Sequence, residues 1–268
     1  MKKFINANIY RNNDATEILV ENGVIRVLGT DLPPAEETID LKGRLVVPPY
    51  VDAHLHLDYV YTGGSKGAKN NTGTLFEGVQ FIRTHIDVCD PNLTGLKAML
   101  EVREQLKDNV TIQIVAFPQE GMYAYKGGDE MVEEALKMGA DCVGSIPHFE
   151  WAREIGEKSI HRTVELAVKY DKLIDVHCDE TDDVMSRFVE LLNALAMTED
   201  IGTRTAASHT CSFGSADNAY AFRMMRLFQR SGLNFIALPT ENAYLQGRQD
   251  IYPLRGIPVP ETGAELRH

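Results

Sequence analysis

Residues 49–239 alternate between short β-prone runs and helical patterns, and this alternation most limits the folds open to the chain. We expect strands at 51–57, 80–88, 111–119, 142–149, 173–180, 205–210 and 233–239. A helix is expected at 184–195, where one apolar face is made of Val184, Phe188, Leu191, Leu192 and Leu195. Continuously apolar strands that alternate with helices predict a parallel α/β sheet covered on both sides.

Histidines lie in or at the ends of three of these expected strands. His54 and His56 are two residues apart, so on a strand both imidazoles face one way, about 6–7 Å apart. His177 and His209 each end a later β-prone run. Ligands at the carboxyl ends of strands fit a (β/α) barrel better than a doubly wound sheet. Because neutral imidazole binds zinc and iron alike, the pattern predicts one metal site without specifying the ion.

Other polar residues lie at the same predicted end of the barrel, its mouth, where the strands have their carboxyl ends. Glu180 follows His177 by three residues, just past a strand end, where a general acid or base would be placed. Gln119 ends another strand and is either a ligand for a heterocyclic amide edge or a turn residue. His85 is interpreted as a core residue or a site residue, and His148 as a mouth residue or a structural one.

Composition narrows the classes of partner. Lys and Arg number 27 and Asp and Glu 39, a formal charge of −12, which disfavours nucleic acid and anionic membranes and is compatible with a small neutral or cationic substrate. None of the four cysteines forms a C-x-x-C pair, so reduced thiols are expected. The chain shows neither a signal-peptide core nor a membrane-spanning run, and we expect a cytoplasmic protein.

Three segments are expected along the chain. Residues 1–48 read as a small β subdomain, with strands at 4–10, 18–28 and 38–41 and a hairpin turn at Asn22-Gly23. Residues 49–256 read as a barrel of about seven strands, and residues 257–268 as a divergent tail. The stretch between the first two barrel strands has the chemistry of a loop and leaves no room for a crossover helix.

A colinear series of motifs resembles the cytosine deaminase branch of the amidohydrolase superfamily. The matching segments lie at 47–58, 73–78, 83–88, 115–121, 146–150, 175–180, 207–210 and 245–248. The resemblance implies a distorted (β/α)8 TIM barrel beside a small β-sandwich. It implies one divalent ion, iron or zinc, held by His54, His56 and His177. It further implies that Glu180 protonates a pyrimidine ring, that His209 positions the attacking water, and that Gln119 and Leu75 contact the substrate.

The implied reaction converts cytosine and water to uracil and ammonia. Alternatives are hydrolysis of another cyclic amidine, such as creatinine or isocytosine, or of an N-substituted pyrimidine or triazine. Family members carry a metal-binding aspartate on an eighth strand that this chain does not reach, so we expect a shortened, incomplete barrel. A catalytically impaired remnant is therefore a further alternative, and exposed barrel edges would favour a homo-oligomer.

Overall fold

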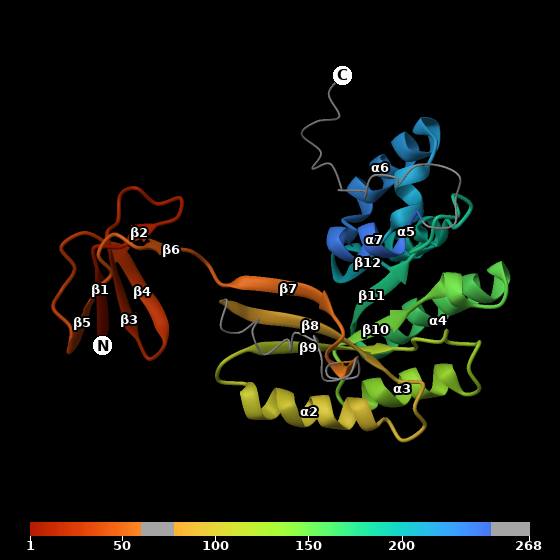
Figure 1. The fold of residues 1–268 in the computed structure, drawn as a ribbon, viewed down its shortest axis with the longest axis horizontal. Coiled ribbons are helices and arrows are strands. Elements are labelled where there is room, and N and C mark those ends of the chain that lie inside the picture. The colour runs from red at the N-terminus through yellow and green to blue at the C-terminus, as the bar shows by residue number, and fades with distance from the viewer. Residues whose placement is uncertain (60–77, 248–268) are drawn as a thin grey trace. The chain divides into compact units, whose positions relative to one another are not determined.

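The computed structural model describes residues 1–59 and 78–247, which form two compact units, Met1–Tyr50 and Val51–His268 (Figure 1). Leu75, the tail at 257–268 and most of the segment between the first two barrel strands lie outside the described residues. Each unit is considered by itself below.

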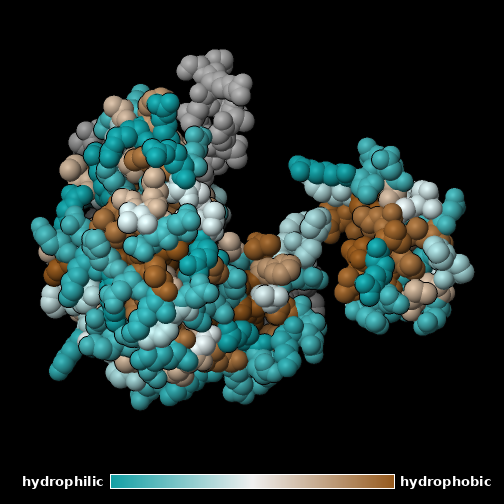
Figure 2. Space-filling model, turned by 180° about the vertical axis from the view of Figure 1, so that it is seen from behind, coloured by the Kyte–Doolittle hydropathy of each residue, from teal (hydrophilic) through white to brown (hydrophobic). Residues whose placement is uncertain are grey.

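The N-terminal unit is built on a four-stranded sheet in the order β4-β3-β1-β5. Its strands, with the small β2–β6 pair, are β1 (Lys2–Ile5), β2 (Asn8–Ile9), β3 (Glu17–Glu21), β4 (Val24–Gly29), β5 (Glu37–Asp40) and β6 (Leu45–Val46). The predicted hairpin turn is confirmed, because Asn22 and Gly23 both have positive φ, 51° and 76°, between antiparallel β3 and β4. Apolar surface is visible on this unit in Figure 2, and Val24 and Ile25 of the edge strand β4 are more than half exposed.

The larger unit carries a seven-stranded parallel sheet in the order β13-β12-β11-β10-β9-β8-β7. The strands are β7 (Tyr50–Leu55), β8 (Val79–Asp87), β9 (Thr111–Phe117), β10 (Cys142–Ser145), β11 (Leu173–Cys178), β12 (Thr205–His209) and β13 (Asn234–Ile236). The helices are α2 (Thr94–Leu106), α3 (Gly128–Met138), α4 (Arg153–Tyr170), α5 (Phe188–Thr198), α6 (Asn218–Ser231) and α7 (Pro239–Leu245). The predicted alternation of strands and helices is confirmed.

Several predicted boundaries differ from the structure, and two of these differences have a clear physical reason. The strand expected at 142–149 ends at Ser145 and gives way to the 3₁₀ helix η2 (Pro147–Phe149), because proline favours the first position of a helix. The helix expected at 184–195 begins only at Phe188. Buried Asp179 accepts hydrogen bonds from the backbone N–H groups of Phe188 and Val189, and these bonds set the start of the helix.

The seven-stranded sheet curls into a nearly closed barrel. Strands β7 and β12 are five neighbours apart in the sheet, which in a flat sheet would separate them by about 24 Å. His54 of β7 and His209 of β12 nevertheless have ring centroids 4.8 Å apart. The sheet must therefore bend round on itself, and it brings the carboxyl ends of distant strands into one place.

The core of this unit has two parts. A large apolar cluster, which includes Ile86, Leu96, Ile114 and Ile160, lies between strands and helices, and a smaller one of Val115, Phe117, Cys142 and Ile146 lies apart from it. All four cysteines are free thiols. Within the described ranges, the helices are too short or too polar to cross a membrane.

Candidate metal centre

Three histidines predicted as ligands converge at the carboxyl ends of β7 and β11. The Nε2 atoms of His56 and His177 are 3.2 Å apart, and the rings of His54 and His177 have centroids 4.5 Å apart. Two nitrogens bound at 2.0–2.1 Å to one tetrahedral zinc ion lie about 3.3 Å apart. Ligand atoms of His54, His56 and His177 all lie within 4.8 Å of one another. The three imidazoles therefore fit a single cation. The strands that position them, β7 and β11, are not adjacent in the sheet.

Unpartnered ring nitrogens support the same interpretation. In the described part of the chain, His54 Nε2, His56 Nδ1, His177 Nδ1 and His209 Nε2 are buried without a hydrogen-bond partner. Buried polar atoms normally find a partner, since an unpaired one costs about 1–3 kcal/mol. His54 Nε2 is therefore free to bind a cation, and the Nε2 atoms of His56 and His177 face each other at a distance that suits two ligands of one ion.

His209 and Glu180 lie beside the three histidines. His209 Nδ1 is 3.2 Å from Glu180 Oε1. The backbone leaves the extended conformation at His209, where φ is 69°, and at Thr210, where φ is 52°. Asn242 of α7 donates from Nδ2 to His209 Nδ1 at 3.0 Å and to Glu180 Oε1 at 3.4 Å.

Burial sets the protonation of these groups. It lowers the pKa of His54 and His177 well below the ordinary value and that of His56 and His209 to about 3, with neighbouring histidines adding to the effect. Neutral imidazole is the form that binds metal. Burial, with a smaller contribution from Glu241, raises the pKa of Glu180 to about 8, although the bond from Asn242 opposes the shift. Glu180 is therefore mostly protonated at neutral pH.

A cavity of about 460 Å³ opens over this cluster. Its lining includes His56, His177, Glu180 and Gln119. The structure thus brings Gln119, half-buried after β9, to the same mouth as the histidines. The volume lies within the range of small-molecule sites.

His85 and His148, whose roles the sequence left open, have different surroundings. His85 is fully buried, with its ring centroid 4.0 Å from that of His54 and its Nε2 3.5 Å from Asp175 Oδ1. His148 lies in η2 and lines a separate pocket with Arg153 and Phe188. The structure therefore places His85 against the cluster and His148 outside the mouth cavity.

Asp175, Ser208 and Asn242 were not singled out from the sequence, although all three contact the cluster. Burial acts to raise the pKa of Asp175, but nearby His85 and Arg83 and the hydrogen bond from Ser208 outweigh it and leave that pKa below its ordinary value. Asp175 precedes His177 by two residues, the same spacing as His54 and His56, and this was the available signal. Asn242 gave none, because it comes from the short helix α7 that follows β13.

Several known proteins resemble this chain in sequence or fold. A model of the amidohydrolase family matches residues 82–259. The 5-methylcytosine deaminase from Klebsiella pneumoniae, in a structure liganded with 5-fluorocytosine, is 40% identical with a TM-score of 0.84, covering 94% of this chain and 69% of that one. N-isopropylammelide isopropyl amidohydrolase of Pseudomonas sp. (strain ADP) is 27% identical, covering 81% of this chain and 62% of the relative. Pterin deaminase of Rhizobium rhizogenes is 25% identical, covering 87% and 60%. The chain thus spans about six-tenths of the length of these curated relatives.

Proposed function

Because this chain belongs to the amidohydrolase family, we propose that it hydrolyses a C–N bond, namely the bond to the exocyclic amine of cytosine or a close cyclic amidine such as 5-methylcytosine. The observation that carries the proposal is the convergence of His54, His56 and His177 beside a cavity that His56, His177 and a protonated Glu180 line together. The 40% identity to a 5-methylcytosine deaminase supports the pyrimidine class of substrate.

His54, His56 and His177 would hold one divalent ion, zinc or iron. When bound, such an ion supplies Lewis acidity and lowers the pKa of a water molecule toward neutrality. Gln119, at the edge of the cavity, offers an amide donor and acceptor to the polar edge of a heterocycle.

Glu180 is assigned to the proton transfers and His209 to positioning the attacking water. Deamination consumes one water, forms a C–O bond and breaks the C–NH₂ bond; the ring nitrogen and the leaving amine each take up one proton, and the water supplies both. Glu180 carries such a proton at neutral pH, because its pKa is about 8. His209 is neutral, and because its Nδ1 accepts from Asn242 its Nε2 carries the hydrogen and can donate a hydrogen bond that positions the attacking water. Glu180, once it has protonated the ring nitrogen, takes up the two protons that the water gives up, passes one to the leaving amine and keeps the other. Asn242 orients both side chains.

The test combines metal analysis with a substrate panel. Protein loaded with zinc or iron is incubated with cytosine, 5-methylcytosine, isocytosine, creatinine and pterin while ammonia release is measured. We expect turnover of cytosine or 5-methylcytosine above the others. Glu180→Gln should retain metal but lower kcat/KM by about 10²–10⁴-fold. Gln119→Ala should lower turnover of the preferred pyrimidine, whereas Gln105→Ala, an exposed glutamine on α2, should not.

A second candidate is hydrolysis of an N-substituted triazine, favoured by the similarity to N-isopropylammelide isopropyl amidohydrolase. Release of isopropylamine from N-isopropylammelide, without ammonia from cytosine, would select it. A metal content below a few tenths of an equivalent would instead favour a non-catalytic remnant. Full metal loading with no release from any of these compounds would refute the proposed function.

A further inference from the structure

A buried chain of hydrogen bonds lies beneath the histidine cluster. Asp175 of β11 is fully buried; its Oδ2 accepts from Arg83 Nη1 of β8 at 2.9 Å, and its Oδ1 accepts from Ser208 Oγ of β12 at 2.6 Å. Ser208 Oγ in turn lies 3.0 Å from His54 Nδ1. Four residues on four different strands are thus linked into one connected line of polar contacts.

The chemistry of these four side chains, called the relay below, determines where each proton lies. Arg83 is always charged and donates only, and a carboxylate paired with it accepts only. The hydroxyl hydrogen of Ser208 must therefore point toward Asp175, which leaves only lone pairs of Ser208 facing His54. His54 Nδ1 must then carry a hydrogen in order to bond to Ser208. In a neutral imidazole the other nitrogen, Nε2, is consequently a bare lone pair.

We propose that Arg83, Asp175 and Ser208 are positioning residues that hold His54 in its Nδ1–H tautomer and so present its Nε2 lone pair to a divalent cation. The inference rests on the proposed function, because it takes the His54, His56 and His177 cluster to be a metal site. Ligand histidines commonly donate their second ring nitrogen to such a partner, and removing the partner weakens metal binding about 10- to 100-fold. Here the partner is a hydroxyl backed by an ion pair.

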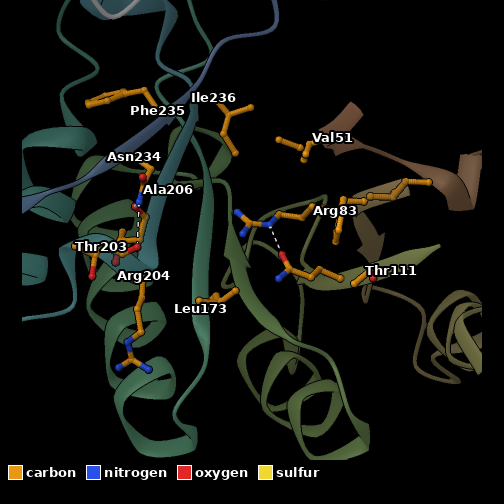
Figure 3. Close-up of a pocket in the computed structure, with 15 residues that line it drawn as sticks. Val51, Arg83, Thr111, Leu173, Thr203, Arg204, Ala206, Asn234, Phe235 and Ile236 are labelled. Carbon is orange, nitrogen blue, oxygen red and sulfur yellow. Dashed lines mark hydrogen bonds between the residues drawn. The ribbon is translucent and has the colours of Figure 1, made fainter. Parts of the chain in front are cut away.

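The location of the relay in the sheet fits a role in positioning His54 better than a role in stability. Asp175 and His177 are two residues apart on β11, as are Arg83 and His85 on β8, so the relay forms a layer below the ligands. Replacing a buried ion pair by apolar residues is often neutral or stabilising, so stability alone does not require it. At its far end, Arg83 donates from Nε to Gln113 at 3.0 Å and lines a cavity of about 540 Å³ near the amino ends of the strands (Figure 3).

Two substitutions act on the relay in different ways. Ser208→Ala removes the acceptor for His54 Nδ1–H and leaves the tautomer free. Asp175→Asn should reverse the direction in which the hydrogen bonds of the relay are donated. The amide oxygen of the asparagine must face Arg83, so its NH₂ group faces Ser208. Ser208 would then donate to His54 Nδ1, and the imidazole hydrogen would move to Nε2, where it blocks the cation.

The first measurement is zinc affinity of the metal-free protein, determined by competition with a chelator. We expect Ser208→Ala to weaken binding about 10- to 100-fold and Asp175→Asn to weaken it by at least as much. Ser145→Ala is the matched control: Ser145 is a fully buried serine on β10 whose hydroxyl has no hydrogen-bond partner within the described ranges, and its loss should leave the affinity within about twofold of the wild type.

The second measurement is independent of metal and of activity. Histidine ¹⁵N NMR of the metal-free protein should show His54 as the Nδ1–H tautomer in the wild type and as the Nε2–H tautomer in Asp175→Asn. If Asp175→Asn does not fold, the Ser208→Ala and Ser145→Ala pair decides. An unchanged His54 tautomer in Asp175→Asn, or zinc affinity in Ser208→Ala equal to that of Ser145→Ala, would overturn the relay. A wild type that binds zinc and shows the expected tautomers but hydrolyses nothing would instead refute only the proposed function.

Discussion

Asp179→Asn is expected to destabilise the loop that carries Glu180. The Asp179 carboxylate is fully buried; its Oδ1 accepts from Ser186 Oγ at 2.6 Å and from the Phe188 N–H at 3.0 Å, and its Oδ2 accepts from the Val189 N–H at 2.9 Å. An asparagine can place its oxygen at only one of these positions. Its NH₂ group then faces the Val189 N–H, and one buried donor is left without an acceptor.

The size of the effect follows from these bonds. An unpaired buried donor costs about 1–3 kcal/mol, and two bonds that change from charge-assisted to neutral lose about 1 kcal/mol each. Burial raises the pKa of Asp179, so removal of the charge returns part of this loss. We expect a net decrease of about 2–4 kcal/mol in the free energy of unfolding, a large part of the ordinary total of about 5–15 kcal/mol.

Urea unfolding of the metal-free protein measures this difference. The control is Asp183→Asn in the same loop, because Asp183 is exposed and its carboxylate accepts one backbone bond, from Met185 at 2.8 Å. We expect the control to lose less than about 1 kcal/mol. Equal unfolding midpoints for the two variants would show that the buried carboxylate does not hold the start of α5, and would refute the reasoning.

Three further predictions concern the same unit. Gly156→Ala in α4 should lower the melting temperature, because its Cβ would lie 2.5 Å from Pro147 O, whereas Gly95→Ala in α2, with nothing closer than 3.5 Å, should be neutral or stabilise by up to about 1 kcal/mol. His56 and His209 have pKa values near 3 in the fold and about 6.5 in the unfolded chain. Acidification from pH 6.5 toward pH 3 therefore protonates the unfolded chain first and should lower the free energy of unfolding of the metal-free protein by about 1.4 kcal/mol per pH unit per histidine. Urea midpoints that do not change between pH 7 and 5 would contradict this. Chelation should lower the melting temperature of zinc-loaded protein and re-addition restore it, since zinc at 100 times its Kd adds about 2.7 kcal/mol; a melting temperature insensitive to chelation would argue against the site.

The strand positions and the paired histidines were readable from the sequence, because both depend on local periodicity. Residues two apart on a strand share a face whatever the rest of the chain does, so His54 and His56 could be assigned to one side before any fold was known. The strand–helix alternation likewise specified a parallel sheet with ligands at the carboxyl ends of its strands. The hairpin at Asn22 and Gly23 was predictable for the same reason, since its turn type depends on two adjacent residues.

Contacts between distant strands were decided by tertiary structure alone. The link from Asp175 through Ser208 to His54 joins three strands, and no periodicity within one strand encodes which hydroxyl faces which imidazole. Asn242 reaches His209 only because α7 follows β13 closely after the sheet has curled. The raised pKa of Glu180 is also a property of the fold, because it comes from burial and from Glu241, 61 residues further along the chain. Local geometry is written in short stretches of residues, whereas burial and proton positions depend on what the folded chain brings together.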